Sequence, residues 1–369
     1  MPNQSNQNSY FIPAIIVILV VLIGFFIIFP SISDKSAQTN SQNKDFVGST
    51  DYDKYVQNLQ SGGPPKDGIP PIENPEYQNV EDVGSFLNEK DVVFVLDYKG
   101  VVKIYPQKIL VWHEIVNEEV DGEKVSVTYC PLTGSVVGYK GYIDKIDKDT
   151  TYGTSGKLLN SNLVMYDRET ESYIPQILGI AVTGELEDTR LDSLPMIWTT
   201  WDLAKQKYPN AQVLTDDTGF FRNYNRDPYG SYLETGNYYD SGEAIFPLMN
   251  EDDALQKKDI VVGIRGKDAQ IAILKDSIRK EKVINFELGA EKIVAIYDES
   301  LDVVRTFSRN FDGDILTFSM NEGGKIIDNK DNEWSVTGVS SNGELMWVDS
   351  FDVMWFAWMA FFPETELYK

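Results

Sequence analysis

The pattern of hydrophobic and polar positions divides the chain into an apolar run, a polar stretch and a long mixed body. The run at 11–30 carries no charge and is long enough to span a bilayer, so we expect one transmembrane anchor after a short tail at 1–10. A cleaved signal peptide is the alternative, but the run exceeds a usual signal core and the tail has no Lys or Arg. Residues 31–61 are rich in Ser, Asn, Gln, Asp and Lys, which predicts a flexible linker before a folded body at 62–369.

The body repeats itself at a constant spacing in the residue numbering. The segment HEIVNEEVDGEKVSVTYC at 113–130 aligns without a gap with EKVINFELGAEKIVAIYD at 281–298, an offset of 281 − 113 = 168. We therefore expect repeat one at about 75–215, an inter-repeat segment at 216–254 and repeat two at about 255–369. The predicted fold class is α+β and mainly β, an internally duplicated, pseudo-twofold body with a few short helices. We expect these helices at Pro106–Leu110, Thr200–Lys207 and Val353–Phe361.

Asp121-Gly122 stands between two alternating runs and predicts a β-hairpin with a two-residue turn. Val120 then faces Glu123, and Glu119 faces Lys124, a pair that recurs as Glu287 and Lys292. One face should be buried, and the opposite face should be more polar. The same register places His113 opposite Cys130. The expected buried face consists of Val116, Val120, Val125, Val127 and Tyr129.

Composition restricts the chemistry. The 33 basic and 57 acidic side chains give a net charge of −24, which argues against a nucleic-acid partner. The chain has one Cys and one His. These counts exclude an intramolecular disulfide, a site with several thiolates and any site that requires two imidazoles.

The main functional hypothesis is a soft-metal or ligand site at the pair His113 and Cys130, with Met165 as a third candidate ligand. Thiolate, imidazole and thioether together suit Cu(I), so copper is the candidate cofactor. Zinc would require an oxygen ligand from Glu114 or Asp167. The alternative without a cofactor is that the pair hydrogen-bonds and packs, while Met165 fills core.

Two further hypotheses stay open. The chain is a thiol-dependent enzyme if Cys130 acts as nucleophile and His113 as its base. It is a non-catalytic interaction domain if the Tyr-rich stretch at 220–239 forms a recognition surface, for which the sequence identifies no protein or ligand partner. The alternative for that stretch is a connection that packs its own rings.

Several motifs resemble the DUF3179 family. They are DGIP at 67–70, VWHEIVN at 111–117, YCPLTGS at 129–135, NSNLVMYDR at 160–168 and WFAW at 355–358 with FPET at 362–365. The resemblance implies an extracytoplasmic domain attached to the membrane by a single span. It implies no activity, because the family has no assigned function. Some members carry a second Cys where this chain has Thr133, so the resemblance does not extend to a paired-thiol redox role.

Overall fold

The computed structural model describes residues 52–369, which belong to one compact unit. The predicted tail, anchor and most of the predicted linker lie outside the described residues. No helix in residues 52–369 has the length and apolarity needed to cross a membrane. The described chain is mainly β with a few short helices, as the sequence predicts.

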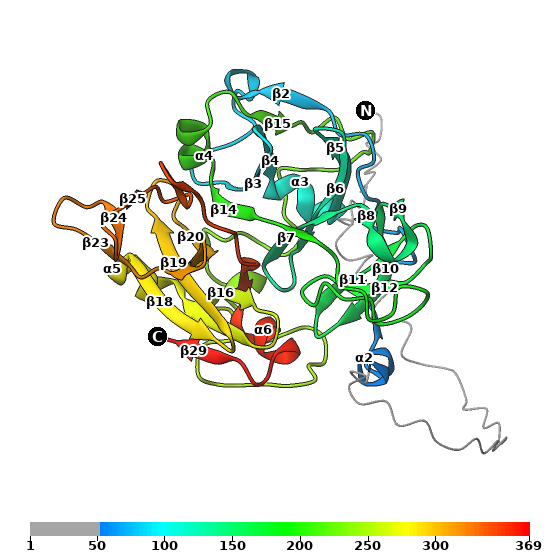
Figure 1. The fold of residues 1–369 in the computed structure, drawn as a ribbon. Coiled ribbons are helices and arrows are strands. Elements are labelled where there is room, and N and C mark those ends of the chain that lie inside the picture. The colour runs from blue at the N-terminus through cyan, green and yellow to red at the C-terminus, as the bar shows by residue number, and fades with distance from the viewer. Residues whose placement is uncertain (1–51) are drawn as a thin grey trace, which may run out of the picture. The chain divides into compact units, whose positions relative to one another are not determined.

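A first series of elements leads to the hairpin that carries Cys130 (Figure 1). Alternating hydrophobic positions form its strands, and a buried apolar face holds its one helix. The elements are β3 (Val92–Tyr98), β4 (Val101–Pro106), α3 (Gln107–His113), β5 (Ile115–Val120), β6 (Glu123–Cys130) and β7 (Ser135–Lys140).

A second series repeats the first, shown in yellow and orange in Figure 1. From the helix to the last strand, every boundary recurs at the offset of 168 that the sequence shows. The elements are β16 (Ile260–Arg265), β17 (Gln270–Leu274), α5 (Lys275–Glu281), β18 (Val283–Leu288), β19 (Glu291–Asp298) and β20 (Val303–Ser308).

Each series closes with a strand, a helix and a short strand, whose boundaries recur at a shorter offset, 350 − 196 = 154. The sheet orders correspond, β14-β3-β4-β15-β2 and β28-β16-β17-β29, and the last strand of each series pairs in parallel. The same connectivity therefore occurs twice. The closing elements are β14 (Met196–Thr200), α4 (Trp201–Lys207) and β15 (Gln212–Leu214), then β28 (Ser350–Met354), α6 (Trp355–Phe361) and β29 (Glu366–Tyr368); β2 is Tyr77–Asn79.

Long insertions separate β7 from β14 and β20 from β28. The first supplies three strands of the sheet β1-β10-β11-β12, whose edge strand β1 (Gln60–Ser61) precedes repeat one, and the second forms the meander β23 to β27. The first insertion contains β8 (Tyr142–Ile143), η2 (Asp144–Ile146), β9 (Lys148–Asp149), β10 (Tyr152–Leu159), β11 (Asn162–Asp167), β12 (Tyr173–Pro175) and β13 (Ser193–Leu194). The second contains β21 (Asn310–Phe311), β22 (Asp314–Ile315), β23 (Phe318–Met320), β24 (Ile326–Asp328), β25 (Glu333–Trp334), β26 (Val339–Ser340) and β27 (Gly343–Glu344).

The predicted hairpin register is confirmed. Glu119 pairs with Lys124, and every pair from Ile115–Thr128 to Val120–Glu123 is formed. Asp121 and Gly122 both have positive φ, as a type I′ turn requires. In the second hairpin Glu287 and Lys292 form an ion pair of 2.6 Å.

The predicted helices are present with shifted ends. The first, α3, continues beyond Leu110 to His113, and the second begins at Trp201. The third begins at Trp355, because Val353 still belongs to β28. The remaining helical turns are η1 (Val80–Asp82) and η3 (Tyr238–Asp240).

The linker prediction is wrong at its end. Residues 53–57 form α2 (Asp53–Gln57), and β1 (Gln60–Ser61) pairs with β10. Tyr52 and Tyr55 are buried in the main hydrophobic core. The two tyrosine rings bury enough apolar surface to hold this segment against the body, although most of the residues around them are polar.

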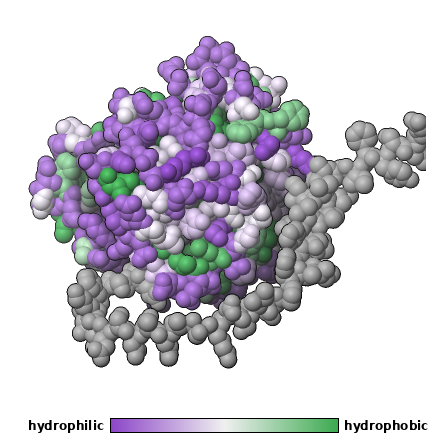
Figure 2. Space-filling view, turned by 90° about the vertical axis from the view of Figure 1, so that its right-hand side faces the viewer, coloured by the Kyte–Doolittle hydropathy of each residue, from purple (hydrophilic) through white to green (hydrophobic). Residues whose placement is uncertain are grey.

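The hairpin is buried on one face along its length and on the other face only away from its turn. Its expected inner residues, among them Val127 and Tyr129, belong to one core cluster. On the expected polar face Asn117, Ser126 and Cys130 are nearly inaccessible, while the pair Glu119 and Lys124 near the turn is exposed. The face of the molecule in Figure 2 is mostly hydrophilic, with apolar residues in small separate patches.

Candidate active site around Cys130

Cys130 is the last residue of β6 and is buried at 1% exposure. Its Sγ accepts a hydrogen bond from the Leu163 N–H at 3.3 Å, and its S–H points to the Ser161 carbonyl oxygen at 3.8 Å. Both partners belong to the NSNLVMYDR motif. The strand-end position and the turn at 160–161 therefore hold the sulfur in one place.

The loop after Cys130 is held from two directions. The Tyr238 hydroxyl donates to the Leu132 carbonyl oxygen at 2.6 Å, and the Met354 N–H donates to the Thr133 carbonyl oxygen at 3.0 Å. Gly134 has φ +52°, and a Cβ there would lie 3.1 Å from the Met354 side chain. The inter-repeat segment and repeat two thus both fix the loop.

Buried polar side chains support the base of the loop. The Gln176 Oε1 accepts from the Ser135 hydroxyl at 2.7 Å and from Asn162 Nδ2 at 2.9 Å. Asn162 Nδ2 also donates to the Thr133 hydroxyl at 3.1 Å. Because these groups satisfy one another, the loop has one well-defined arrangement beside Cys130.

The carboxyl group of Glu114 raises the pKa of the Cys130 thiol. It connects α3 to β5 with φ +58°, and only 5% of its surface is exposed. Burial raises the pKa of its carboxyl group to about 8. Burial and then the Glu114 charge raise the pKa of the Cys130 thiol to about 11, so the resting thiol is neutral.

Lys258, just before β16, adds a buried amine. Its Nζ lies 3.3 Å from the ring centroid of Tyr238 and 4.8 Å from that of Phe356. No described residue accepts a hydrogen bond from this Nζ. Burial lowers the pKa of Lys258 to about 7, and the negative charge of a Cys130 thiolate opposes that decrease.

His113 does not occupy the strand position that the sequence predicts. It ends α3, and the positive φ of Glu114 turns the chain before β5 begins at Ile115. The His113 Nδ1–H donates to the Pro70 carbonyl oxygen at 2.7 Å, and the Tyr224 hydroxyl donates to Nε2 at 2.7 Å. Both nitrogens are therefore engaged away from Cys130. The predicted pairing of His113 with Cys130 is wrong because α3 ends at His113 and the strand begins only at Ile115. The alternating pattern of the sequence shows no break at this helix end, so it did not reveal where the strand begins.

Met165 lies in β11, opposite Thr154 and Ile174, and is fully buried in the core cluster that contains Cys130. Within residues 52–369, no three His, Cys, Asp or Glu side chains are grouped so that they could hold a metal ion. Metal binding by His113, Cys130 and Met165 stays a prediction.

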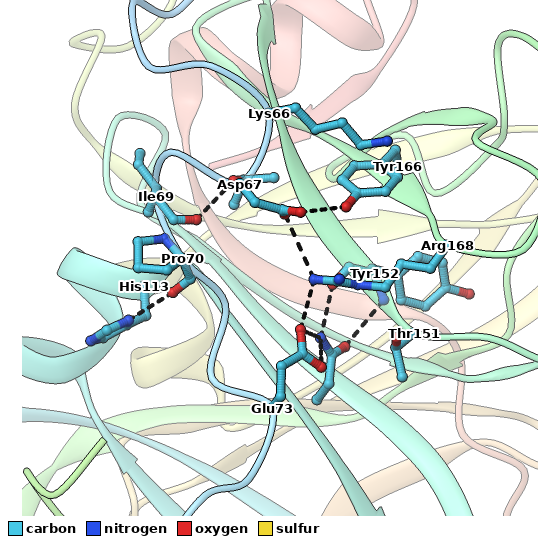
Figure 3. A network of polar contacts seen from close by, with 12 residues as sticks. Lys66, Asp67, Ile69, Pro70, Glu73, His113, Thr151, Tyr152, Tyr166 and Arg168 are labelled. Carbon is cyan, nitrogen blue, oxygen red and sulfur yellow. Dashed lines mark hydrogen bonds and ion pairs between the residues drawn. The ribbon is translucent and has the colours of Figure 1, made fainter. Parts of the chain in front are cut away.

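A second polar network joins three of the sequence motifs (Figure 3). The Tyr166 hydroxyl donates to Asp67 at 2.5 Å, and Arg168 lies between Asp67 and Glu73, with 2.7 Å to the Glu73 carboxylate. Asn117 also donates to Glu73, at 3.2 Å. The network ties the entry loop to β5 and β11. Its buried Asp67 Oδ1 has no hydrogen-bond partner among the described residues and lies 3.7 Å from the Arg168 guanidinium.

The Tyr-rich stretch at 220–239 packs against the body. Tyr232 stacks on Tyr239 with ring centroids 3.8 Å apart and contacts Trp198 edge-on at 5.3 Å. The Tyr129 and Tyr232 hydroxyls are 2.9 Å apart. The stretch therefore covers the Cys130 region with its own rings, and Phe221 is its fully exposed aromatic residue.

The sequence identified Cys130 but not its main electrostatic partners. Glu114 stands next to His113 in the same motif, and its burial follows from the turn that α3 makes there. No motif in the sequence around Lys258 indicates that it belongs to this site, because it lies at the start of repeat two and only the fold brings it there.

A family model described as a protein of unknown function (DUF3179) matches residues 66–365. No curated protein and no solved structure matches the chain.

Proposed function

The chain belongs to the DUF3179 family, and from that premise we propose that its body is a thiol-dependent enzyme with Cys130 as nucleophile and Lys258 as general base. The observation that carries the proposal is the buried Lys258 amine, which lacks a hydrogen-bond partner among the described residues and is within electrostatic range of the only thiol. Burying an amine without a hydrogen-bond partner lowers the stability of the fold. Ionisable groups in such unfavourable positions are concentrated at functional sites.

The pKa values suit this division of roles. With a pKa of about 7, Lys258 is half neutral at physiological pH and can accept a proton. As the Cys130 sulfur forms a bond to an acyl carbon, the S–H proton passes to the Lys258 amine. While the proton leaves and before the bond to carbon is complete, the Leu163 N–H stabilises the negative charge on sulfur.

Glu114 is suited to the role of general acid. Its pKa of about 8 keeps the carboxyl group protonated at neutral pH. When the acyl carbon–leaving-group bond breaks, the Glu114 proton goes to the leaving group and the acyl group stays on Cys130 as a thioester. Water then attacks the thioester carbon, and its proton goes to the Glu114 carboxylate while its hydroxyl group stays on the acyl carbon. As the carbon–sulfur bond breaks, the sulfur takes back the proton held by Lys258, which restores the thiol and the neutral amine.

His113 is a poor base in comparison. Its Nδ1–H and its Nε2 lone pair are both used, by Pro70 and Tyr224. Burial also lowers the pKa of His113, which weakens it further as a proton acceptor.

We place this enzyme outside the cytoplasmic membrane, held by the predicted helix at 11–30. The support is the uncharged apolar run and the family resemblance. A membrane-impermeant protease added to intact cells should digest residues 62–369. Protection of this segment would reverse the orientation.

The single Cys makes the test direct, because alkylation of the intact chain reports on Cys130 alone. We expect the rate of reaction with iodoacetamide to rise through pH about 7, the pKa of Lys258. In Lys258→Met the rise should move toward the pKa of the thiol, and the rate at pH 8 should fall by about tenfold or more.

Lys257→Met is the matched control, because Lys257 is adjacent but forms ion pairs with Glu243 and Glu251. Its profile should keep the wild-type form, with a slight shift to higher pH because the Lys257 charge helps to lower the Lys258 pKa. Equal profiles for both variants, or a wild-type thiol that reacts only after unfolding in urea, would return Cys130 to a purely structural role.

A further inference from the structure

A cavity of about 520 Å³ lies where the two repeats meet. Repeat one contributes β14 and the start of α4, and repeat two contributes α5 and β28. Small-ligand sites have volumes of about 300–1,000 Å³, so one sugar-sized molecule fits.

One wall is aromatic and the other is polar. Trp198 and Tyr232 meet edge-on in the first, with ring planes at 86°. Lys275, Arg279 and Asp352 belong to the second. A ligand here contacts an apolar surface on one side and hydrogen-bonding groups on the other.

Most charges in the polar wall are already paired. Arg279 donates to both carboxylate oxygens of Asp302, at 2.9 and 2.6 Å, and to Asp276 at 2.8 Å. The Lys275 Nζ lies 3.5 Å from Asp352 Oδ2. The lining holds four carboxyl groups against these two cations, so the pairs leave an excess of carboxyl groups and, among the described residues of the lining, no free cation to attract an anionic ligand.

Asp352 is the exception. Its side chain is 8% exposed, and its Oδ1 has no hydrogen-bond partner among the described residues. Leaving such a buried oxygen unpaired destabilises the fold unless a ligand or another group pairs with it. Burial also raises the pKa of Asp352, so the carboxyl group can either accept or donate a hydrogen bond.

The repeat shows that the fold does not require these charges. At the offsets of 168 and 154, Lys275 and Asp352 correspond to Gln107 and Trp198 of repeat one. Both repeat-one residues are uncharged, although the elements that carry them are the same. The charged pair is therefore specific to repeat two.

The equivalent space in repeat one is a smaller cavity of about 360 Å³, lined by Gln107, Lys108 and Tyr232 among others, and rings of the inter-repeat segment narrow it. The Tyr232 ring contacts Trp198, and Gln107 Nε2 donates to the Tyr239 hydroxyl at 3.3 Å. Rings with hydroxyl groups thus occupy part of this space in repeat one. In repeat two the corresponding cavity is larger, about 520 Å³.

We propose that this cavity binds a neutral, hydroxyl-bearing ring of monosaccharide size. Sugar hydroxyls both donate and accept, which matches Asp352 and Lys275, and the C–H face of the ring can pack on Trp198. The excess of carboxyl groups over cations in the lining disfavours a phosphate. The pairing of Arg279 and Lys275 with carboxylates disfavours a polyamine.

The test is saturation-transfer NMR on the full chain with glucose, galactose, mannose and N-acetylglucosamine at millimolar concentration. We expect saturable binding of at least one sugar, with at least a tenfold loss in the double variant Asp352→Leu/Lys275→Met. Asp314→Asn, which removes an exposed partner of Lys330, should bind like wild type.

Leu203→Trp is the second variant, because it fills the cavity without changing a charge. It should abolish sugar binding while the urea midpoint stays near that of wild type. Binding of none of the four sugars, or saturable binding of inorganic phosphate or spermidine instead, would overturn the proposal. Thiol alkylation at Cys130 is a separate readout, so the two proposals fail independently.

Discussion

Asn117 bonds both backbone polar atoms of Tyr152: its Nδ2 donates to the Tyr152 carbonyl oxygen at 2.8 Å, and its Oδ1 accepts from the Tyr152 N–H at 3.2 Å. Asn285, its counterpart in repeat two, does the same to Phe318 at 2.7 and 2.8 Å. Each Asn fastens one strand of an insertion, β10 or β23, to the hairpin sheet. A side-chain amide can complete both bonds because it has a donor and an acceptor in one plane.

Asn117→Ala and Asn285→Ala should therefore each lower the free energy of unfolding by about 2 kcal/mol, because each leaves a buried backbone group unpaired. Urea unfolding followed by circular dichroism measures the loss. Exposed Asn342→Ala is the control and should change stability by less than about 0.5 kcal/mol. A loss in only one repeat would show that the shared geometry is not equally important in both.

His113 should titrate below its ordinary pKa of 6.5, because burial disfavours the imidazolium. As pH falls below 6.5, the unfolded chain takes up a proton that the folded chain does not, so the free energy of unfolding decreases until the folded pKa is reached. The chain has one His, so a single NMR resonance reports the titration. His113→Asn should lack this component of the pH dependence. A midpoint at or above 6.5 would contradict the buried neutral ring.

Lys258→Met should raise the free energy of unfolding by about 1–2 kcal/mol at pH 7, because it removes a buried amine without a hydrogen-bond partner. The Tyr238 ring face offsets part of that cost. In the wild type, stability should rise with pH from about 7 to 10.5, since only the unfolded chain keeps the proton there. Lys257→Met should shift stability by about 0.5 kcal/mol at most. Destabilisation by Lys258→Met at pH 7 would count against this reasoning.

Gly263→Ala should destabilise the protein by about 2 kcal/mol, because its new methyl group overpacks the core. A Cβ at this position in β16 would lie 2.2 Å from the Trp358 ring, which is fully buried and has its indole N–H bonded to Thr365. Thermal unfolding measures the effect. Gly242→Ala is the matched control, because a Cβ there meets nothing within 4 Å. Equal midpoints for the two variants would show that Trp358 relaxes freely.

The sequence by itself determined the hairpin and its register. Asp121-Gly122 fixes the turn, and alternation from Ile115 to Thr128 fixes which residues face each other, because both depend on neighbours in the chain. The recurrence of this pattern at 281–298 is likewise visible in the letters. The single Cys and the single His also set the available chemistry, because composition does not depend on the fold.

Tertiary structure alone decided what surrounds Cys130. The helix end at His113 rotates the imidazole toward Pro70, and the turn at Glu114 buries that carboxyl group instead. Lys258 comes within electrostatic range of Cys130 because repeat two packs against repeat one. Periodicity records which side of an element faces inward, but it holds no information on which distant segment meets that side. Burial by such distant segments sets the pKa values of the site.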